Sequence, residues 1–106
     1  MVAAERAQVL DGERAIQRLL QSREGGETEV SCPVGRVDLL TDKHVIEIKH
    51  VSKWIDGCKV ALYATHFSDR KPRVHLFGGY TRETREQIEK ELAKLEIETT
   101  WEKEPF

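Results

Sequence analysis

Apolar residues recur at helical spacing near the start of the chain and in short β-branched runs after it. Val9, Leu10, Ile16, Leu19 and Leu20 follow one another at intervals typical of an amphipathic helix, which we expect to end at Gly25-Gly26. Residues 28–32, 34–40 and 45–49 then form runs typical of strands, separated by Pro33 and by Asp42-Lys43. This half of the chain therefore predicts one helix followed by three strands.

The second half returns to helical spacing and then alternates. Trp54, Cys58, Ala61 and Leu62 predict a second helix, and residues 73–77 predict a fourth strand. Thr81 or Thr84 is the expected N-cap of a third helix, and residues 97–101 are the expected last strand. The order α-β-β-β-α-β-α-β predicts an α/β fold in which a mixed sheet carries a helix on each face.

Length and composition narrow the class of protein. A chain of 106 residues and 12.2 kDa has room for one domain, over residues 1–106. Charged residues make up 34% and mean hydropathy is −0.55, which is typical of a water-soluble fold. No apolar run approaches the ~18 residues of a membrane helix, and residues 1–8 are too charged for a signal peptide. We therefore expect an intracellular protein that has no membrane partner.

Cys32 and Cys58 are far apart, so we expect two core thiols, with neither a zinc site nor a disulfide. The net charge of −2 hides an asymmetry. Residues 36–75 carry eight Lys and Arg against five Asp and Glu, which gives +3 and leaves −5 for the rest. A basic surface for nucleic acid is therefore possible despite the acidic total.

Three charged residues of the central strands form a candidate site. Glu47 and Lys49 are two apart and project from one face of their strand. If Asp42-Lys43 is a two-residue hairpin turn, Asp38 lies opposite Glu47, with Cβ atoms about 4.5 to 5.5 Å apart. Such carboxylates repel each other unless a cation lies between them. A longer loop with the same odd or even number of residues gives the same pairing, whereas a one-residue shift of register places Asp38 and Glu47 on opposite faces. The alternative interpretation of these three charged residues is a sheet face that is simply exposed to solvent.

The first helix supplies a further carboxylate. On a helical projection Glu13 lies in the middle of the apolar stripe, where a charged group needs a partner. We therefore expect Glu13 to join the site unless it bends out to solvent. Glu5 lies near the same stripe and is the alternative.

These residues resemble a known family. Gly35-Arg-Val-Asp38, eight residues and Glu47-Ile-Lys49, preceded by a helix with an inward Glu, resemble the PD-(D/E)XK nuclease superfamily, which has the restriction-endonuclease-like fold. The segment Lys59-Val-Ala-Leu-Tyr-Ala64 is similar to a helix of several branches. The resemblance implies an αβββαβ core, with the C-terminal helix and strand as additions.

The resemblance also implies a function, namely hydrolysis of nucleic-acid phosphodiester bonds with Mg²⁺ or Mn²⁺. Asp38, Glu47 and the carbonyl of Ile48 would hold the metal with Glu13, and Lys49 would orient the nucleophile. The expected substrate contacts are Lys59, Arg36, Lys53 and His50. We expect DNA rather than RNA, recognised by its structure more than by its sequence.

Two other functions remain open, and so does the oligomeric state. One is a catalytically inert nuclease-fold module that binds nucleic acid or a partner protein, and the other is a small domain whose charged strand face is merely solvated. A homodimer is expected because one small chain has little surface to grip a duplex. Its interface would use the third helix, residues 97–101 and Phe106.

Overall fold

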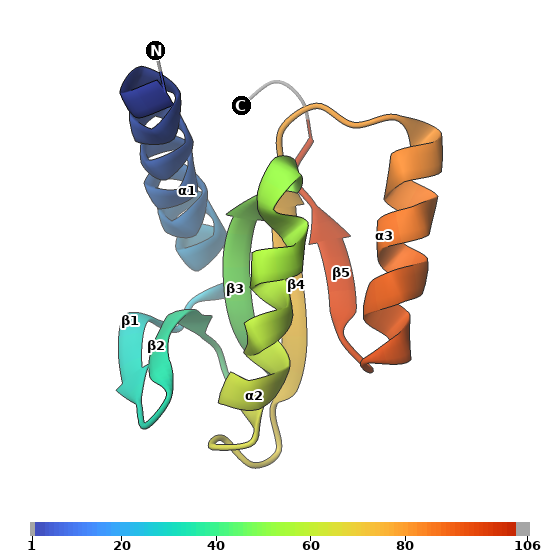
Figure 1. The fold of residues 1–106 in the computed structure, drawn as a ribbon. Coiled ribbons are helices and arrows are strands. Elements are labelled where there is room, and N and C mark those ends of the chain that lie inside the picture. The colour runs from blue at the N-terminus through green and yellow to red at the C-terminus, as the bar shows by residue number, and fades with distance from the viewer. Residues whose placement is uncertain (1, 104–106) are drawn as a thin grey trace.

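A computed structural model describes the backbone of residues 2–103 and the side chains of residues 12–103. The chain folds as a mixed α+β domain, coloured from blue to red in Figure 1. Its elements are α1 (Val2–Glu24), β1 (Glu27–Cys32), β2 (Gly35–Leu40), β3 (His44–His50), the 3-10 helix η1 (Val51–Lys59), α2 (Val60–Ala64), β4 (Lys71–Phe77), α3 (Arg82–Lys94) and β5 (Glu98–Trp101). The element order predicted from the sequence is confirmed.

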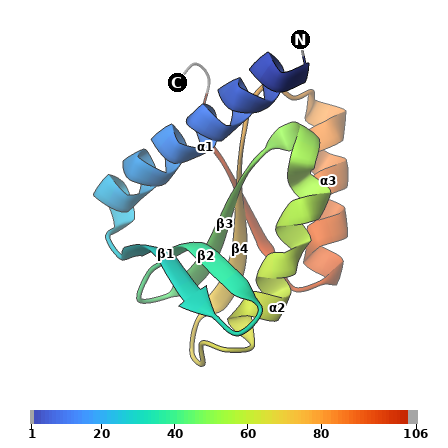
Figure 2. The same ribbon diagram turned by 60° about the vertical axis from the view of Figure 1, so that its left-hand side comes forward.

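The strands form one five-stranded sheet in the order β1-β2-β3-β4-β5. The first three strands are an antiparallel meander, and β4 and β5 then add in parallel. Figure 2 shows α1 on one side of the sheet and α2 and α3 on the other. The predicted mixed sheet with helices on both faces is therefore confirmed.

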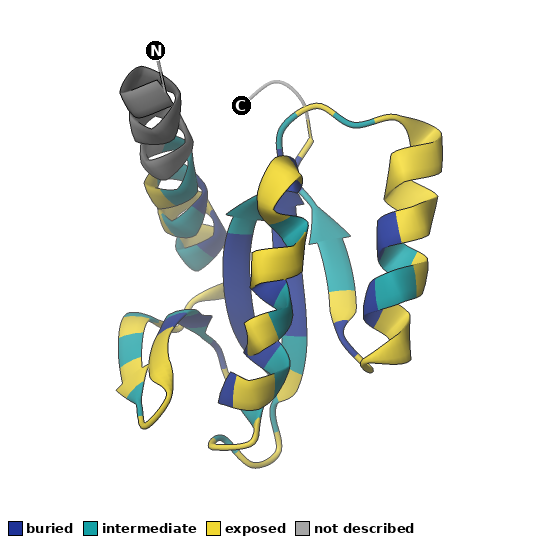
Figure 3. Ribbon diagram, viewed as in Figure 1, coloured by how far each residue is buried: buried dark blue, intermediate teal, exposed yellow. Residues whose placement is uncertain are grey.

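Each face of the sheet has its own hydrophobic core, and Figure 3 shows that much of β3 and β4 between them is buried. On the α1 side, Ile16 and Leu20 pack with Ile46 and Ile48 of β3. On the α2 and α3 side the core includes the buried residues Val37, Val45, Val60, Val74, Leu76, Ile88 and Leu92. Cys32 and Cys58 are free thiols packed against this second core, as expected. Because helices cover both faces, Glu47 on β3 is buried even though it is a charged residue type.

The second helix differs from its prediction. Its first part is the 3-10 helix η1, in which Lys53 departs from helical geometry at φ −115° and ψ 23°. Gly57 lies so close to β4 that an added Cβ would be 3.1 Å from the Val74 side chain. The tight approach to the sheet leaves only residues 60–64 in regular α geometry. No helix in the described part of the chain is long and apolar enough to cross a membrane.

Ion pairs fix the C-terminal end of α1 to β4 and to the residue after β5. Arg73 donates to both carboxylate oxygens of Glu24, at 2.8 and 2.7 Å. Arg23 binds Glu102 in the same two-pronged way, at 2.9 and 2.8 Å, across 79 positions of sequence. His75, which is buried, lies 3.1 Å from Glu102. We call these five residues the α1 clamp.

Candidate functional site

The β2–β3 hairpin has the register expected from a two-residue turn. Leu39 pairs with Ile46 and Leu40 with Val45, and the N–H of Thr41 donates to the carbonyl of His44 at 3.0 Å. The Thr41 side chain closes the turn by accepting the backbone N–H of His44. This hairpin brings Asp38 and Glu47 to the same level of the sheet.

The regular strand pairing stops one position before these two carboxylates, and their side chains continue it. Glu47 Oε1 accepts the backbone N–H of Asp38 at 3.3 Å. In return, Asp38 Oδ2 accepts the backbone N–H of Ile48 at 2.8 Å. The sequence predicted side chains standing next to each other on a regular ladder, whereas here each carboxylate reaches the opposite backbone. The opening of the ladder at this point explains the difference.

Burial raises the pKa of both carboxyl groups, and the charge of Asp38 raises that of Glu47 further. Glu47 is 2% exposed, and burial, followed by the nearby charge of Asp38, raises its pKa to about 8. Burial also raises the pKa of Asp38, while the Ile48 N–H and the charge of Lys49 oppose the rise. At neutral pH most Glu47 side chains therefore keep their proton, so the pair carries less negative charge than two ionised carboxylates would.

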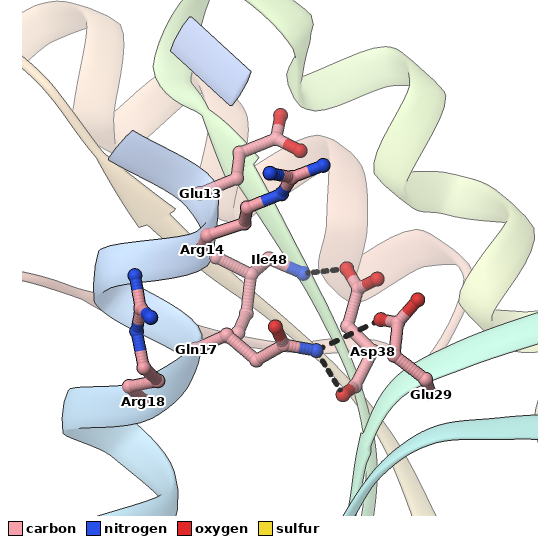
Figure 4. A pocket seen from close by; sticks show the side chains of 7 residues that line it. All are labelled: Glu13, Arg14, Gln17, Arg18, Glu29, Asp38 and Ile48. Atoms are coloured by element: carbon pink, nitrogen blue, oxygen red, sulfur yellow. Dashed lines mark hydrogen bonds between the residues drawn. The ribbon is translucent and has the colours of Figure 1, made fainter. Parts of the chain in front are cut away.

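A cavity of about 360 Å³ opens between α1 and the first three strands, next to Asp38. We call it the α1 cavity. Its lining comprises Glu13, Arg14, Gln17, Arg18, Glu29, Asp38 and Ile48. Figure 4 shows the side chains of α1 along one wall, facing Asp38 and Glu29 on the other. Both acidic and basic groups therefore reach one concave surface.

Gln17 and Glu29 close one side of this cavity. The Gln17 amide donates to Glu29 Oε2 and to the carbonyl of Asp38, both at 2.8 Å. Glu29 has a φ of +55°, in the left-handed region that few residues other than glycine adopt. Helical spacing could have indicated Gln17, because it lies one turn after Glu13 on the same face. Nothing in the sequence signals the backbone of Glu29.

Glu13 lies half-buried in the cavity wall, as the apolar stripe suggested. Burial raises the pKa of its carboxyl group, and the charge of Lys49 opposes the rise. The described side chains nevertheless contain no group of three or more His, Cys, Asp and Glu placed to hold a metal. The side chain of Glu5 lies outside the described residues. The available donor set for a cation is therefore the Asp38–Glu47 pair.

Cationic side chains surround the carboxylates. Arg14 and Arg18 are exposed, and among the described residues neither has an ion-pair partner. The charges of Lys49 and Lys59 act on both Asp38 and Glu47. Lys59 also lies 6.0 Å from the centre of the Tyr63 ring. Positively charged side chains thus lie around the Asp38–Glu47 pair, whose own negative charge is reduced.

The remaining predicted residues lie around the site rather than in it. Arg36 is exposed and lies 3.7 Å from Glu29. His50 caps η1, since its Nδ1 accepts the Ser52 N–H at 3.1 Å, and its ring packs edge-on against Phe77. Lys53 is exposed on η1. None of these three residues lines the α1 cavity, whereas Glu13, Asp38 and Ile48 of the predicted site do.

Comparison with known proteins finds relatives among viral proteins. The chain is 35% identical over 86 residues to putative KilA-N domain-containing protein L33 of Acanthamoeba polyphaga mimivirus, covering 80% of this chain and 35% of that protein. It is 35% identical over 68 residues to protein L32 of the same description, covering 63% of this chain and 18% of the relative. The corresponding values for protein R878 are 30% over 67 residues, 62% and 19%. This chain therefore spans about a third of the first relative and under a fifth of the others.

No family model matches the chain. No solved structure matches it either.

The relatives overturn the resemblance to the PD-(D/E)XK nuclease superfamily. They are named after the KilA-N domain, which is a different family. The inferred metal-dependent endonuclease, with its hydrolase activity, is therefore wrong. The restriction-endonuclease-like identity of the αβββαβ core is not confirmed, and what stands is the mixed α+β sheet described above.

Proposed function

We propose that this chain is a module that binds nucleic acid, and DNA in particular, without cleaving it. The observation that carries the proposal is the pair Arg14 and Arg18, exposed at the mouth of the α1 cavity without carboxylate partners among the described residues. Guanidinium groups bind phosphate oxygens in two-pronged fashion, and unpaired ones lose no internal ion pair when they do so.

Glu47, which binds the Asp38 backbone next to the cavity, adds little negative charge against a polyanion because its raised pKa keeps most of it protonated at neutral pH. Lys49 and Lys59 offset the charges of Asp38 and Glu13. KilA-N domains are a DNA-binding family, and the relatives named after this domain support the same choice of partner. A DNA partner would also place the protein inside the cell.

A binding assay tests this proposal directly. Fluorescence anisotropy of a labelled oligonucleotide is measured with the wild-type protein and with the double variant Arg14→Ala/Arg18→Ala. The variant should bind at least tenfold more weakly, and its loss should grow as salt is lowered. Lys94→Ala, which removes a cation from the far end of α3, is the matched control. Equal affinities of wild-type and double variant would overturn the proposal.

The carboxylate pair gives a reason to propose Mg²⁺ or Mn²⁺ as a ligand. Asp38 and Glu47 each have one oxygen engaged by a backbone N–H, which leaves the other oxygen available. Mg²⁺ commonly binds one or two carboxylates and keeps several waters. Such an ion would neutralise the pair and add positive charge below a bound phosphate, with Ile48 and Glu13 nearby.

A homodimer also stays a proposal, with a changed interface. Trp101 is used within the chain, where its indole N–H donates to Glu89 at 2.7 Å and its ring packs on Tyr80. Phe106 lies outside the described residues. The surface that α3 and β5 offer a second copy is therefore the outer edge of β5, a strand that pairs on one side only among the described residues.

A further inference from the structure

A second concave surface lies on the opposite side of the sheet from the α1 cavity. This groove, of about 580 Å³, runs between the start of η1 and the start of α3. Its wall includes Val51, Ser52, Trp54, Tyr80, Thr81 and Thr84. We call it the aromatic groove, after Trp54 and Tyr80.

Each of the two aromatic side chains carries one polar group, the indole N–H of Trp54 and the hydroxyl of Tyr80. Within the described residues, neither the indole N–H of Trp54 nor the hydroxyl of Tyr80 has a hydrogen-bond partner. Both residues are half-buried and pack against the core, so their rings are held in place. The Tyr80 ring is further fixed by Trp101, with ring centres 4.5 Å apart. A planar ligand that also accepts or donates hydrogen bonds would match these unused groups.

The groove lies close to the proposed phosphate contacts. Ile48 lines the α1 cavity and Val51 lines the groove, so the two lining residues are three positions apart at the carboxyl end of β3. Three residues span at most about 10 Å. Lys53 directly precedes Trp54 in η1, is exposed and has no ion-pair partner among the described residues. A nucleic-acid strand held by Arg14 and Arg18 would pass over the carboxyl end of β3, next to Lys49, to bring its next bases to the groove on the other side of the sheet.

We infer that the aromatic groove binds an unpaired base, so that the substrate class is single-stranded or locally opened nucleic acid. The inference rests on the proposed nucleic-acid binding and adds a second contact to it. A base in a continuous duplex has both faces stacked, whereas an unpaired base can stack on Trp54 and Tyr80. Lys53 would hold the phosphate that follows.

The test uses three ligands, namely a single strand of about 15 nucleotides, the same strand with abasic positions in its centre, and the matching duplex. Base stacking on one aromatic side chain changes affinity by about fivefold to a hundredfold. Trp54→Leu should therefore bind the single strand about tenfold more weakly than wild type and bind the duplex unchanged. Leu62→Ala, an exposed apolar position on α2 outside the groove, is the control and should bind all three like wild type.

The abasic strand separates stacking from loss of structure. Wild type should bind the abasic strand about tenfold more weakly than the intact strand. Trp54→Leu should bind the abasic and the intact strand equally well. The chain has two tryptophans, so the fluorescence of the variant Trp101→Phe reports on Trp54 alone. The intact strand should quench this Trp54 fluorescence, and the abasic strand should not. Equal losses for single strand and duplex, or equal abasic effects on both proteins, would overturn the inference alone. Failure of wild type to bind any of the ligands would overturn the proposed function and this inference with it.

Discussion

Glu47 and Asp38 each bind the backbone of the opposite strand, through Asp38 N–H to Glu47 Oε1 and Ile48 N–H to Asp38 Oδ2. These contacts hold two buried carboxyl groups together at the point where β2 and β3 separate. Burial and repulsion both oppose a second negative charge on the pair. The stability of the folded protein should therefore depend on pH and on bound cations.

The first prediction is that stability falls as the pH rises. The pKa of Glu47 is about 8 in the folded protein against 4.5 as its ordinary value. The folded state therefore keeps a proton that the unfolded chain releases, so the stabilisation is complete below pH 4.5 and is lost as the pH rises towards 8. The slope should reach up to about 1.4 kcal/mol per pH unit.

Urea unfolding in EDTA at several pH values measures this slope. Glu47→Gln should flatten it and should raise the free energy of unfolding at pH 8, since the amide carries no charge. Glu27→Gln, at an exposed position at the start of β1, is the control and should leave the slope unchanged. A wild-type protein equally stable across this pH range would contradict the protonated state of Glu47.

A second prediction concerns divalent cations. Mn²⁺ at a hundredfold excess over its Kd should stabilise the folded protein by about 2.7 kcal/mol, if the unfolded chain does not bind it. Asp38→Asn should stabilise the metal-free protein, because it removes a carboxyl group that burial disfavours in its charged form, while its side-chain carbonyl oxygen still accepts the Ile48 N–H. The same variant should lose the Mn²⁺ effect. Calorimetric scans with no Mn²⁺ dependence in wild type would count against cation binding by the pair.

A third prediction concerns the α1 clamp. Arg73→Ala leaves Glu24 without its partner and Thr100 without the bond from Arg73 Nε, so unfolding should become easier by about 2 to 4 kcal/mol. Glu24→Gln should cost less, because Glu24 is partly exposed to water. In a double-mutant cycle the two changes should couple by about 1 to 3 kcal/mol. Strict additivity would show that the pair contributes nothing beyond its separate residues.

The fourth prediction is the mass in solution. A dimer through β5 has twice the chain mass of 12.2 kDa, which is 24.4 kDa. Light scattering at micromolar concentration should give this value and should move towards 12.2 kDa on dilution. A mass of one chain at every concentration would exclude the dimer.

The sequence predicted those features that depend on periodicity. The alternation along β3 placed Ile46 and Ile48 on one face and Glu47 on the other, and a two-residue turn then determined the register of β2. Helical spacing placed Glu13 among apolar residues. Each of these predictions needed only the geometry of a single element or hairpin.

What the sequence did not reveal depends on contacts between distant segments. The side-chain bonds of Asp38 and Glu47 arise where the ladder opens, and hydrophobic patterning carries no signal for such an opening. Glu29 reaches the cavity because its backbone has a left-handed conformation. A glutamate in the sequence does not indicate such a conformation, whereas a glycine would. From the sequence alone, Arg14 and Arg18 indicate only the solvent-exposed face of a helix. Their position in a cavity wall depends on β1 and β2 lying opposite them in the fold.

The α1 clamp has a consequence for the order in which the protein can assemble. Arg23 is translated 79 positions before its partner Glu102, which follows β5. The Arg23–Glu102 half of the clamp can therefore close only after β5 has left the ribosome, whereas the Glu24–Arg73 half needs only β4. Until then α1 can already pack on β3 through Ile16 and Leu20, so the cavity wall is placed in steps and its second anchor is added last.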